Sequence, residues 1–232
     1  MSNTPAFIPP AGLRPVVPVL KSPQGLATGV TVLLALCAVA DLVAIASHAY
    51  TYSLLGDWES LTLDEARRSD RWAGQSASYQ FTALFVTAVV FVIWFHRVRV
   101  NAEVFAQDSQ TKRAGWAVGG WFIPFGCLWI PRQIAGEVWD ASTQAAPDGS
   151  RRKVSQAPVT IWWTAWVLAM ALRALASVTD RAEIAGPSQD SVGVLLVADS
   201  VHFVAAVLAI LFVRKLTRMQ NIKATQGPRA AA

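Results

Sequence analysis

The stretch that decides the fold is residues 26–50, LATGVTVLLALCAVADLVAIASHAY, in which Asp41 is the only formal charge. A helix needs roughly 17–25 mainly apolar residues to cross about 30 Å of hydrocarbon, so this stretch is long enough to span a membrane. Three further apolar stretches follow at residues 77–95, 159–178 and 192–213. Because a chain inside lipid must satisfy its own backbone hydrogen bonds, all four are predicted to be transmembrane helices.

The composition of the whole chain is typical of a membrane protein. Its 232 residues are 53% hydrophobic and 15% charged, whereas a soluble domain has about 25% charged residues. The net charge of +5 would suggest a nucleic-acid partner in a soluble protein. Membrane topology accounts for it better, so we expect no nucleic acid. The distant Cys37 and Cys127 exclude a small secreted protein held together by disulfides.

The basic residues predict the topology and decide how to interpret a fifth apolar stretch, residues 115–131. This stretch contains Pro124, Pro131 and four glycines, which would kink or weaken a helix. With four spans and a cytoplasmic N-terminus, fifteen Lys and Arg lie inside and four outside, whereas a fifth span would leave seven inside and twelve outside. The positive-inside rule therefore favours four spans. Eight of the ten tryptophans would then lie near the cytoplasmic boundary, where we expect them to anchor the protein.

The predicted fold class is all-α integral membrane: four transmembrane helices in a bundle, plus a Trp/Pro-rich segment at 115–140 that is interfacial or re-entrant on the cytoplasmic side. The transmembrane domain covers residues 26–215. We expect a disordered Pro-rich cytoplasmic tail at 1–25 and a basic cytoplasmic tail at 216–232. The predicted location is the cell inner (plasma) membrane, multi-pass, with both termini in the cytoplasm.

The loop between the first two spans contains a helix signal. Thr62 and Glu65 have the spacing of a capping box, in which each residue caps the backbone of the other. We therefore predict a short surface helix in this outer loop.

Ionisable residues inside the spans carry the functional prediction. A charge near the bilayer centre costs roughly 2.5–3.5 kcal/mol, so each such residue needs a reason. In every span the polar and small residues recur at a spacing of three or four, which places them on one helical face, as in the interior of a bundle. These faces comprise Cys37, Asp41, Ala44 and His48 in the first span, Ser76, Gln80, Ala83 and Thr87 in the second, Trp166, Ala169, Arg173, Ala176 and Asp180 in the third, and Asp199, His202, Ala206 and Ala209 in the fourth.

The depth of these residues predicts which of them pair. A rise of about 1.5 Å per residue places Arg173 level with Asp199 and Asp41 level with His202. We expect an ion pair and an acid–imidazole pair in the outer half of the membrane, beside a polar cavity that opens outward. The ion pair can be structural, by neutralising two charges and fixing helix register, or it can belong to a ligand or proton site. The acid–imidazole pair can move a proton near neutral pH.

Seven residues are therefore candidates for a site. The candidates for catalysis are Asp41, Asp199 and His202, and the candidates for binding are Arg173, His48, Gln80 and Trp166. His48 and His202 differ in depth by about 12 Å, which is too far for both to ligate one haem. The histidines also lack the close spacing of a metal site. We expect no cofactor and no metal.

Two segments resemble a known family. The first is WFHRVRVNA at 94–102, and the second begins as GWAVGGWFIP at 115–124 and continues through WIP at 129–131 to EVW at 137–139. Together they are similar to the small bacterial, largely actinobacterial, membrane proteins that carry domain of unknown function 4328, over residues 26–215. The resemblance implies a fold and a location, and it implies no particular chemistry.

This sequence departs from the family pattern at three positions. Cys127 stands where Asn is common, Ile130 where Arg often precedes the second proline, and Arg132 where an aromatic residue follows it. The family pattern would imply polar roles at these three positions, and we do not transfer those roles to this chain.

Two classes of function fit these observations. The first is a non-catalytic module whose polar intramembrane cavity binds membrane lipids, a hydrophobic small molecule or a partner membrane protein. The alternative is an intramembrane enzyme in which a buried acid, Asp41 or Asp199, protonates a hydrophobic olefin, as in a proton-initiated isoprenoid (terpene) cyclase whose aromatic side chains stabilise positive charge. A transporter or channel is disfavoured because four spans enclose little lumen. Since no catalytic motif is present, the binding module is preferred.

Overall fold

The structure is a computed structural model that describes residues 20–106, 109–146, 150, 152, 154–182 and 188–227. Throughout these ranges the regular elements are helices, with no strand. Most of the predicted N-terminal tail, residues 1–19, lies outside the described residues, as do residues 228–232 of the predicted C-terminal tail.

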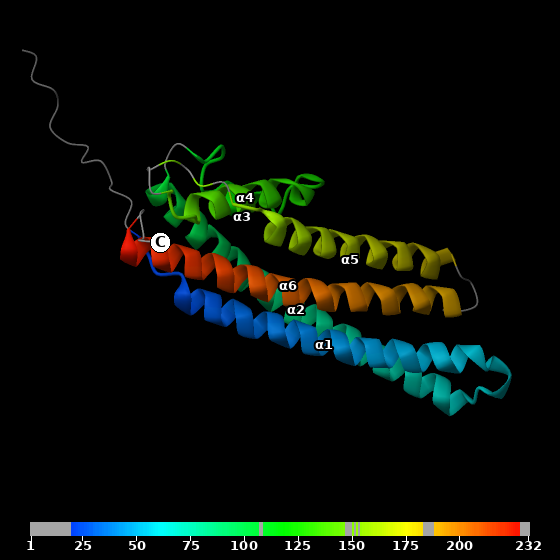
Figure 1. Ribbon diagram of the computed structural model, residues 1–232. Helices are drawn as coiled ribbons and strands as arrows, with labels where there is room; N and C mark the ends of the chain where they lie inside the picture. Colours follow the sequence, from blue (N-terminus) through cyan, green and yellow to red (C-terminus); the bar gives the residue numbers. More distant parts are fainter. Residues whose placement is uncertain are drawn as a thin grey trace, which may run out of the picture.

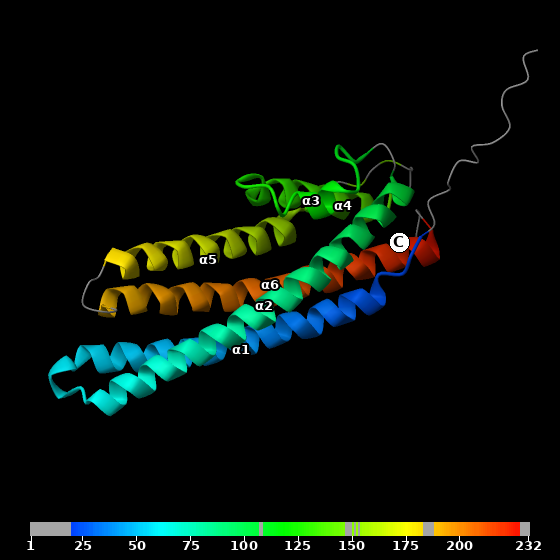
Figure 2. The same cartoon turned by 180° about the vertical axis from the view of Figure 1, so that it is seen from behind.

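Four long helices form the body of the protein: α1 (Gln24–Gly56), α2 (Leu63–Phe105), α5 (Ala157–Ala182) and α6 (Gln189–Gln226). Each is long and apolar enough to cross a membrane, which confirms the four predicted spans and the all-α membrane fold class. In Figure 1, α5, α6 and α1 lie side by side and α2 crosses behind them; Figure 2 shows the same crossing from the other face.

The helices extend well beyond the apolar stretches. The capping box is present: the Thr62 hydroxyl accepts a hydrogen bond from the Glu65 amide, and the Glu65 carboxylate accepts one from the Thr62 amide at 3.0 Å. However, the helix that it starts does not end in the loop. It continues as α2 into the membrane-crossing part, so the short surface helix predicted here is the outer end of a spanning helix.

Residues 216–226 of the predicted basic tail are helical, because α6 continues to Gln226. Its inward face is held by packing and hydrogen bonds. Leu216 and Gln220 are buried, and the Gln220 amide nitrogen donates to the carbonyl of Val98 at 2.9 Å. Burial of these side chains against α2 explains why the helix does not stop at the end of its apolar run.

The Trp/Pro-rich segment folds into α3 (Trp116–Gly119), a 3-10 turn η3 (Gly126–Leu128) and α4 (Ile130–Ser142). It lies at the end of the bundle where α1 begins and α6 ends (Figure 1). The helix α4 packs against α2, α5 and α6. Its placement at a membrane surface remains a prediction.

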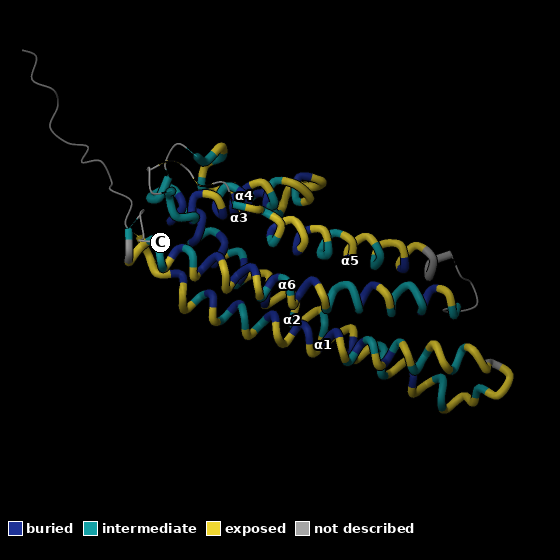
Figure 3. The backbone as a smooth tube through the Cα atoms, viewed as in Figure 1, coloured by how far each residue is buried: buried dark blue, intermediate teal, exposed yellow. Residues whose placement is uncertain are grey.

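The core is aromatic and lies at this same end, where dark-blue buried residues gather near α3 and α4 (Figure 3). Trp162 stacks on Phe212 with ring centroids 4.6 Å apart, and Trp94 meets Phe212 edge to face at 5.9 Å. Trp94, Trp139, Trp162 and Trp163 are all buried. The expectation that the tryptophans serve mainly as anchors at the boundary is therefore wrong for these four, because they are core residues that join α2, α4 and α5 to α6.

Candidate functional site

The central feature of the site is a pair of reciprocal acid–imidazole contacts between α1 and α6. Each helix contributes one carboxylate and one imidazole. Asp41 Oδ2 on α1 lies 2.8 Å from His202 Nδ1 on α6, and His48 Nδ1 on α1 lies 2.7 Å from Asp199 Oδ2 on α6. The two acid–imidazole pairs therefore cross between antiparallel helices, and the predicted pairing of Asp41 with His202 is present.

A residue of α2 joins these two pairs. The amide nitrogen Nε2 of Gln80 donates to Asp41 Oδ1 at 2.9 Å and to Asp199 Oδ1 at 3.2 Å. A side-chain amide has two N–H donors, so one nitrogen can satisfy both carboxylates.

A residue of α5 completes the arrangement. Arg173 Nη2 lies 2.5 Å from Asp199 Oδ1, so the predicted ion pair is present. The Arg173 side chain is 36% exposed, whereas that of Asp199 is 0% exposed. We call the six linked residues from four helices the polar network: Asp41, His48, Gln80, Arg173, Asp199 and His202.

The charges of the polar network nearly balance. It contains two carboxylates, one guanidinium and two imidazoles, so it carries one net negative charge when both imidazoles are neutral and no net charge when one is protonated. Every carboxylate oxygen of Asp41 and Asp199 has a partner. Because all four carboxylate oxygens have partners, the two acids can remain buried in a low-dielectric interior, where an unpaired charge would be strongly destabilising.

A cavity of about 510 Å³ lies beside the network, between α2 and α5. Its wall is largely apolar, and the polar network contributes Gln80, Arg173 and His202 to its lining. Asp41 and Asp199 are not among the lining residues; they are 1% and 0% exposed and lie behind the three that are. The acids therefore position the cavity-lining side chains rather than face the cavity themselves.

The sequence predicted a cavity that opens outward. In the structure the cavity also opens sideways, between α2 and α5. Over the described residues α1 packs extensively on α2 and α6, and α5 on α6, whereas α2 and α5 have hardly any backbone contact. Phe81 and Leu84 on α2 and Met170 on α5 line the cavity and are exposed. Because these side chains belong to the flanks of spanning helices, the cavity is continuous with the surface that would face lipid.

Of the seven predicted site residues, only Trp166 lies outside the polar network. It lines the part of the cavity nearer α3, where its ring is 5.9 Å from Trp121 and 4.9 Å from Trp163. Trp121, Phe91 and Trp162 line the same part. Sequence reasoning did not place these three in the site, and the helical spacing of Trp162 and Trp166 on one face of α5 was the available signal.

Among the described residues no group of three or more His, Cys, Asp or Glu side chains could hold a metal ion. The free thiol of Cys37 lies 3.1 Å from the Thr87 hydroxyl, and both residues line the cavity. The chemistry that this arrangement offers to a molecule in the cavity is thus hydrogen bonding and positive charge on one side and an apolar, aromatic wall on the other.

No curated protein and no solved structure matches this chain at a significant level. The family described as domain of unknown function (DUF4328) matches residues 57–218. The resemblance suggested a match from residue 26, but the matched region begins only after α1. Four residues of the polar network lie within the match: Gln80, Arg173, Asp199 and His202. Asp41 and His48 precede it. Since the match covers more than half of the sequence, the chain belongs to the DUF4328 family.

Proposed function

We propose that this membrane protein is a binding module that holds a hydrophobic small molecule in the cavity between α2 and α5. The observation that carries the proposal is the asymmetry of that cavity: a long apolar wall with Gln80, Arg173 and His202 at one side. Small-molecule sites are typically cavities of about 300–1,000 Å³ with a mostly apolar lining and a few fixed polar groups. The volume of about 510 Å³ falls within that range.

The fixed positions of the polar groups support binding. Gln80 and His202 each form a hydrogen bond with a buried carboxylate, and Arg173 donates one to Asp199. Side chains that are held in place in the absence of a ligand lose little conformational entropy when a ligand binds, which favours affinity.

The enzyme alternative fits the geometry less well. A terpene cyclase of the kind considered would need Asp41 or Asp199 to reach the substrate as a carboxylic acid, but both oxygens of each acid are engaged by other side chains and neither residue lines the cavity. The aromatic rings of Trp121 and Trp166 would suit a carbocation, and they favour this alternative as the second candidate. Formation of a cyclised product from a prenylated substrate, lost in Asp41→Asn, would establish it.

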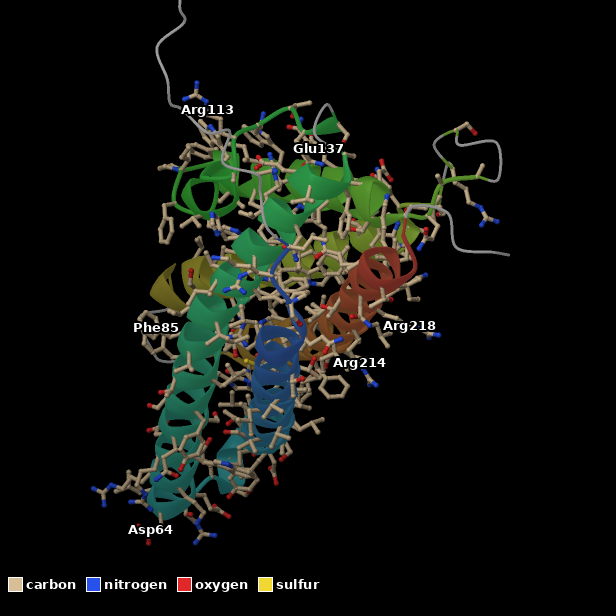
Figure 4. The ribbon with its side chains drawn as sticks, turned by 90° about the vertical axis from the view of Figure 1, so that its left-hand side faces the viewer. Asp64, Phe85, Arg113, Glu137, Arg214 and Arg218 are labelled. Carbon is tan, nitrogen blue, oxygen red and sulfur yellow. The ribbon has the colours of Figure 1, made fainter. Side chains whose placement is uncertain are left out.

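The proposed location is the cell inner membrane, with both termini and the segment containing α3 and α4 on the cytoplasmic side. The charge distribution supports this orientation. Arg113 lies at the end of the molecule that carries Glu137, and Asp64 lies at the opposite end (Figure 4). Arg214 and Arg218 belong to the C-terminal part of α6, which ends near α3 and α4 (Figure 1). Basic residues that flank spanning helices concentrate on the cytoplasmic side of membranes.

The experiment that tests binding fills the cavity. Ala206 on α6 is buried and lines the cavity, whereas Val204 on the same helix is half exposed and does not. We expect purified protein in detergent to bind radiolabelled palmitate or hexadecanol saturably, at about one molecule per chain, when free probe is removed by gel filtration. Ala206→Phe should lose this binding and Val204→Phe should keep it.

Two outcomes would contradict the proposal. One is the absence of saturable binding of either probe, in which case a partner membrane protein becomes the candidate occupant of the gap between α2 and α5. The other is equal binding by the two phenylalanine variants, which would place the probe elsewhere on the protein.

A further inference from the structure

We infer that the ligand is a single-chain amphiphile with an anionic head, a carboxylate or a phosphate, which binds Arg173 while its chain extends along α2 and α5 toward the aromatic end of the cavity. This inference rests on the proposed function and specifies its ligand class and orientation. Three observations carry it: the length of the cavity, the charge that faces it, and the difference between its two ends.

The dimensions of the cavity fit one hydrocarbon chain. Its lining on α2 runs from Ala77 to Val92, which at a rise of about 1.5 Å per residue is about 22 Å. With a volume of about 510 Å³ spread over this length, the cavity is long and narrow, which suits an extended hydrocarbon chain. The length also exceeds half of the roughly 30 Å hydrocarbon core, so a molecule oriented like one leaflet's lipid fits from head to tail.

The charge nearest to a bound molecule is positive. Arg173 is the only formally charged residue among the cavity-lining side chains of the described chain, with its partner Asp199 fully buried behind it. A guanidinium has five N–H donors in a planar fork, and the contact with Asp199 uses Nη2. With the side chain 36% exposed, the rest of the fork is available to a carboxylate or phosphate, the anions whose geometry it matches.

The other polar groups reinforce this end. His202 uses Nδ1 for Asp41, which leaves Nε2 of the same ring for the cavity side. Among the described residues, the titratable side chains that line the cavity are Arg173, His202 and the Cys37 thiol, and the other titratable members of the polar network lie behind them: Asp41, Asp199 and His48. A cationic head would meet Arg173 first, and like charges in a low-dielectric site repel strongly.

The opposite end of the cavity is suited to a chain terminus. Phe91, Trp121, Trp162 and Trp166 line it, with the Phe91 and Trp121 rings 5.8 Å apart and the Phe91 and Trp162 rings 5.7 Å apart. Trp121 comes from the segment between α3 and η3, so this segment closes the cavity at the end away from Arg173. The head therefore lies toward the outer leaflet and the chain points toward the cytoplasmic one.

The test compares an anion with its neutral counterpart. Palmitate and hexadecanol have the same chain length, and 1-palmitoyl lysophosphatidate replaces the carboxylate by a phosphate headgroup. We expect the wild type to bind one or both anions at least about tenfold more tightly than hexadecanol, since hydrogen bonds to charged groups are worth more than neutral ones. Preference for lysophosphatidate would identify a lipid headgroup as the source, and preference for palmitate a free fatty acid.

The variants address Arg173 without leaving a buried charge unpaired. Arg173→Gln alone isolates Asp199 and can fail to fold, so the decisive variant is the double substitution Arg173→Gln with Asp199→Asn, which removes both charges and keeps hydrogen-bonding side chains. It should bind the anions about tenfold more weakly and hexadecanol within about twofold of wild type. Arg173→Lys should retain part of the anion preference. Arg214→Gln is the matched control, because Arg214 is exposed and projects away from the bundle (Figure 4).

The orientation has its own readout. Bromine quenches tryptophan fluorescence at short range, so palmitate brominated at its terminal carbon should quench more than palmitate brominated beside the carboxylate. Trp121→Phe combined with Trp166→Phe should reduce the difference.

Two results would overturn the inferred anion site while leaving the binding function intact. One is equal affinity for palmitate and hexadecanol in the wild type, and the other is an equal loss of both in Arg173→Gln with Asp199→Asn. If none of the three probes binds the wild type, the proposed function itself fails.

Discussion

Asp41 on α1 and Asp199 on α6 share a single hydrogen-bond donor, the Nε2 nitrogen of Gln80, at 2.9 and 3.2 Å. One side chain of α2 thereby couples two buried acids on neighbouring helices. The opposite oxygens of the two acids are engaged by imidazoles that come from each other's helix. The register of α1 against α6 and the position of α2 are thus fixed by the same few atoms.

The first prediction concerns this shared donor. Gln80→Met keeps the size of the side chain but removes both N–H donors, so one oxygen of Asp41 loses its partner and Asp199 keeps only Arg173 on that side. We expect a loss of about 1–3 kcal/mol in stability, the usual effect of leaving a buried polar group unsatisfied. Thermal unfolding of the purified protein in detergent, followed by loss of near-ultraviolet circular dichroism, measures it.

The matched control for this substitution is Gln75→Met. Gln75 lies on the same helix and is exposed. The control should leave the midpoint of unfolding close to that of the wild type. Equal midpoints for the two variants would show that the amide of Gln80 does not hold the two acids in solution.

The second prediction ranks the two acids. Asp199 contacts His48, Gln80 and Arg173, whereas Asp41 contacts a single imidazole and Gln80. Asp199→Asn removes the negative partner of Arg173. Breaking a buried ion pair from one side typically costs about 3–5 kcal/mol, and the partial exposure of Arg173 reduces this to about 2–4 kcal/mol.

Asp41→Asn should be milder, since it leaves no permanent cation without a partner. Adding Arg173→Gln to Asp199→Asn should restore part of the lost stability, because the double variant contains no unpaired charge. Asp70→Asn, at an exposed position of α2, is the control. The same thermal unfolding assay compares the four variants, and a double variant less stable than Asp199→Asn alone would contradict the proposed origin of the loss.

The sequence predicted the main features of the fold for a clear physical reason. Hydrocarbon accepts few backbone conformations, so long apolar stretches identify the spans without any knowledge of their packing. The depth of each ionisable residue was sufficient to predict the contacts of Arg173 with Asp199 and of Asp41 with His202, both of which are present.

The contact of His48 with Asp199 was not predicted, because the apolar stretch ends before the helix does. Counted from Tyr50, His48 is near the end of a span. Counted from the true end of α1 at Gly56, it lies eight residues in, and Asp199 lies ten residues from the start of α6 at Gln189. The two are therefore level within about 3 Å. Helix ends in the polar region are set by caps and packing, and hydropathy does not report them.

The buried tryptophans were misinterpreted for a related reason. A tryptophan near the boundary of a span is equally consistent with a ring in the headgroup region and a ring under a covering helix. Trp94 belongs to the second case, because α4 lies over this end of the bundle, and Trp139 is buried because it belongs to the inward face of α4 itself. Only tertiary packing distinguishes the two cases.

The third prediction concerns orientation in the membrane. Asp64 and Arg113 lie at opposite ends of the molecule and are both exposed (Figure 4). In a background without native cysteines, Asp64→Cys should react with an impermeant maleimide added outside intact cells. Arg113→Cys should react only after the membrane is permeabilised. The opposite pattern would invert the proposed topology.

Gly126 is unsuitable as a labelling site for this experiment, even though it lies in the segment of interest. It is buried, and a Cβ atom added there would come within 2.9 Å of the Ile123 side chain. Arg113 probes the same end of the molecule without disturbing the packing of η3.

The fourth prediction concerns the exposed aromatic residues between α3 and α4. Phe122 and Phe125 are 76% and 77% exposed, and Trp129 is also exposed. Large aromatic side chains gain little by pointing into water, and a membrane interface is the environment that favours them. Phe125 has a φ of 58°. A non-glycine residue in this conformation is uncommon and is held there by its surroundings. We therefore expect the tip of this segment to dip into the cytoplasmic leaflet.

Site-directed spin labelling measures that depth directly. A nitroxide attached through Phe125→Cys, with the protein in lipid nanodiscs, should be relaxed more by oxygen, which concentrates in lipid, than by a water-soluble nickel chelate. The matched position is Thr111, which is exposed at the same end of the molecule and outside the aromatic segment. A label there should show the reverse preference. Equal accessibility to the nickel chelate at both positions would place the aromatic tip in water, and a soluble partner would then be needed to account for its exposed rings.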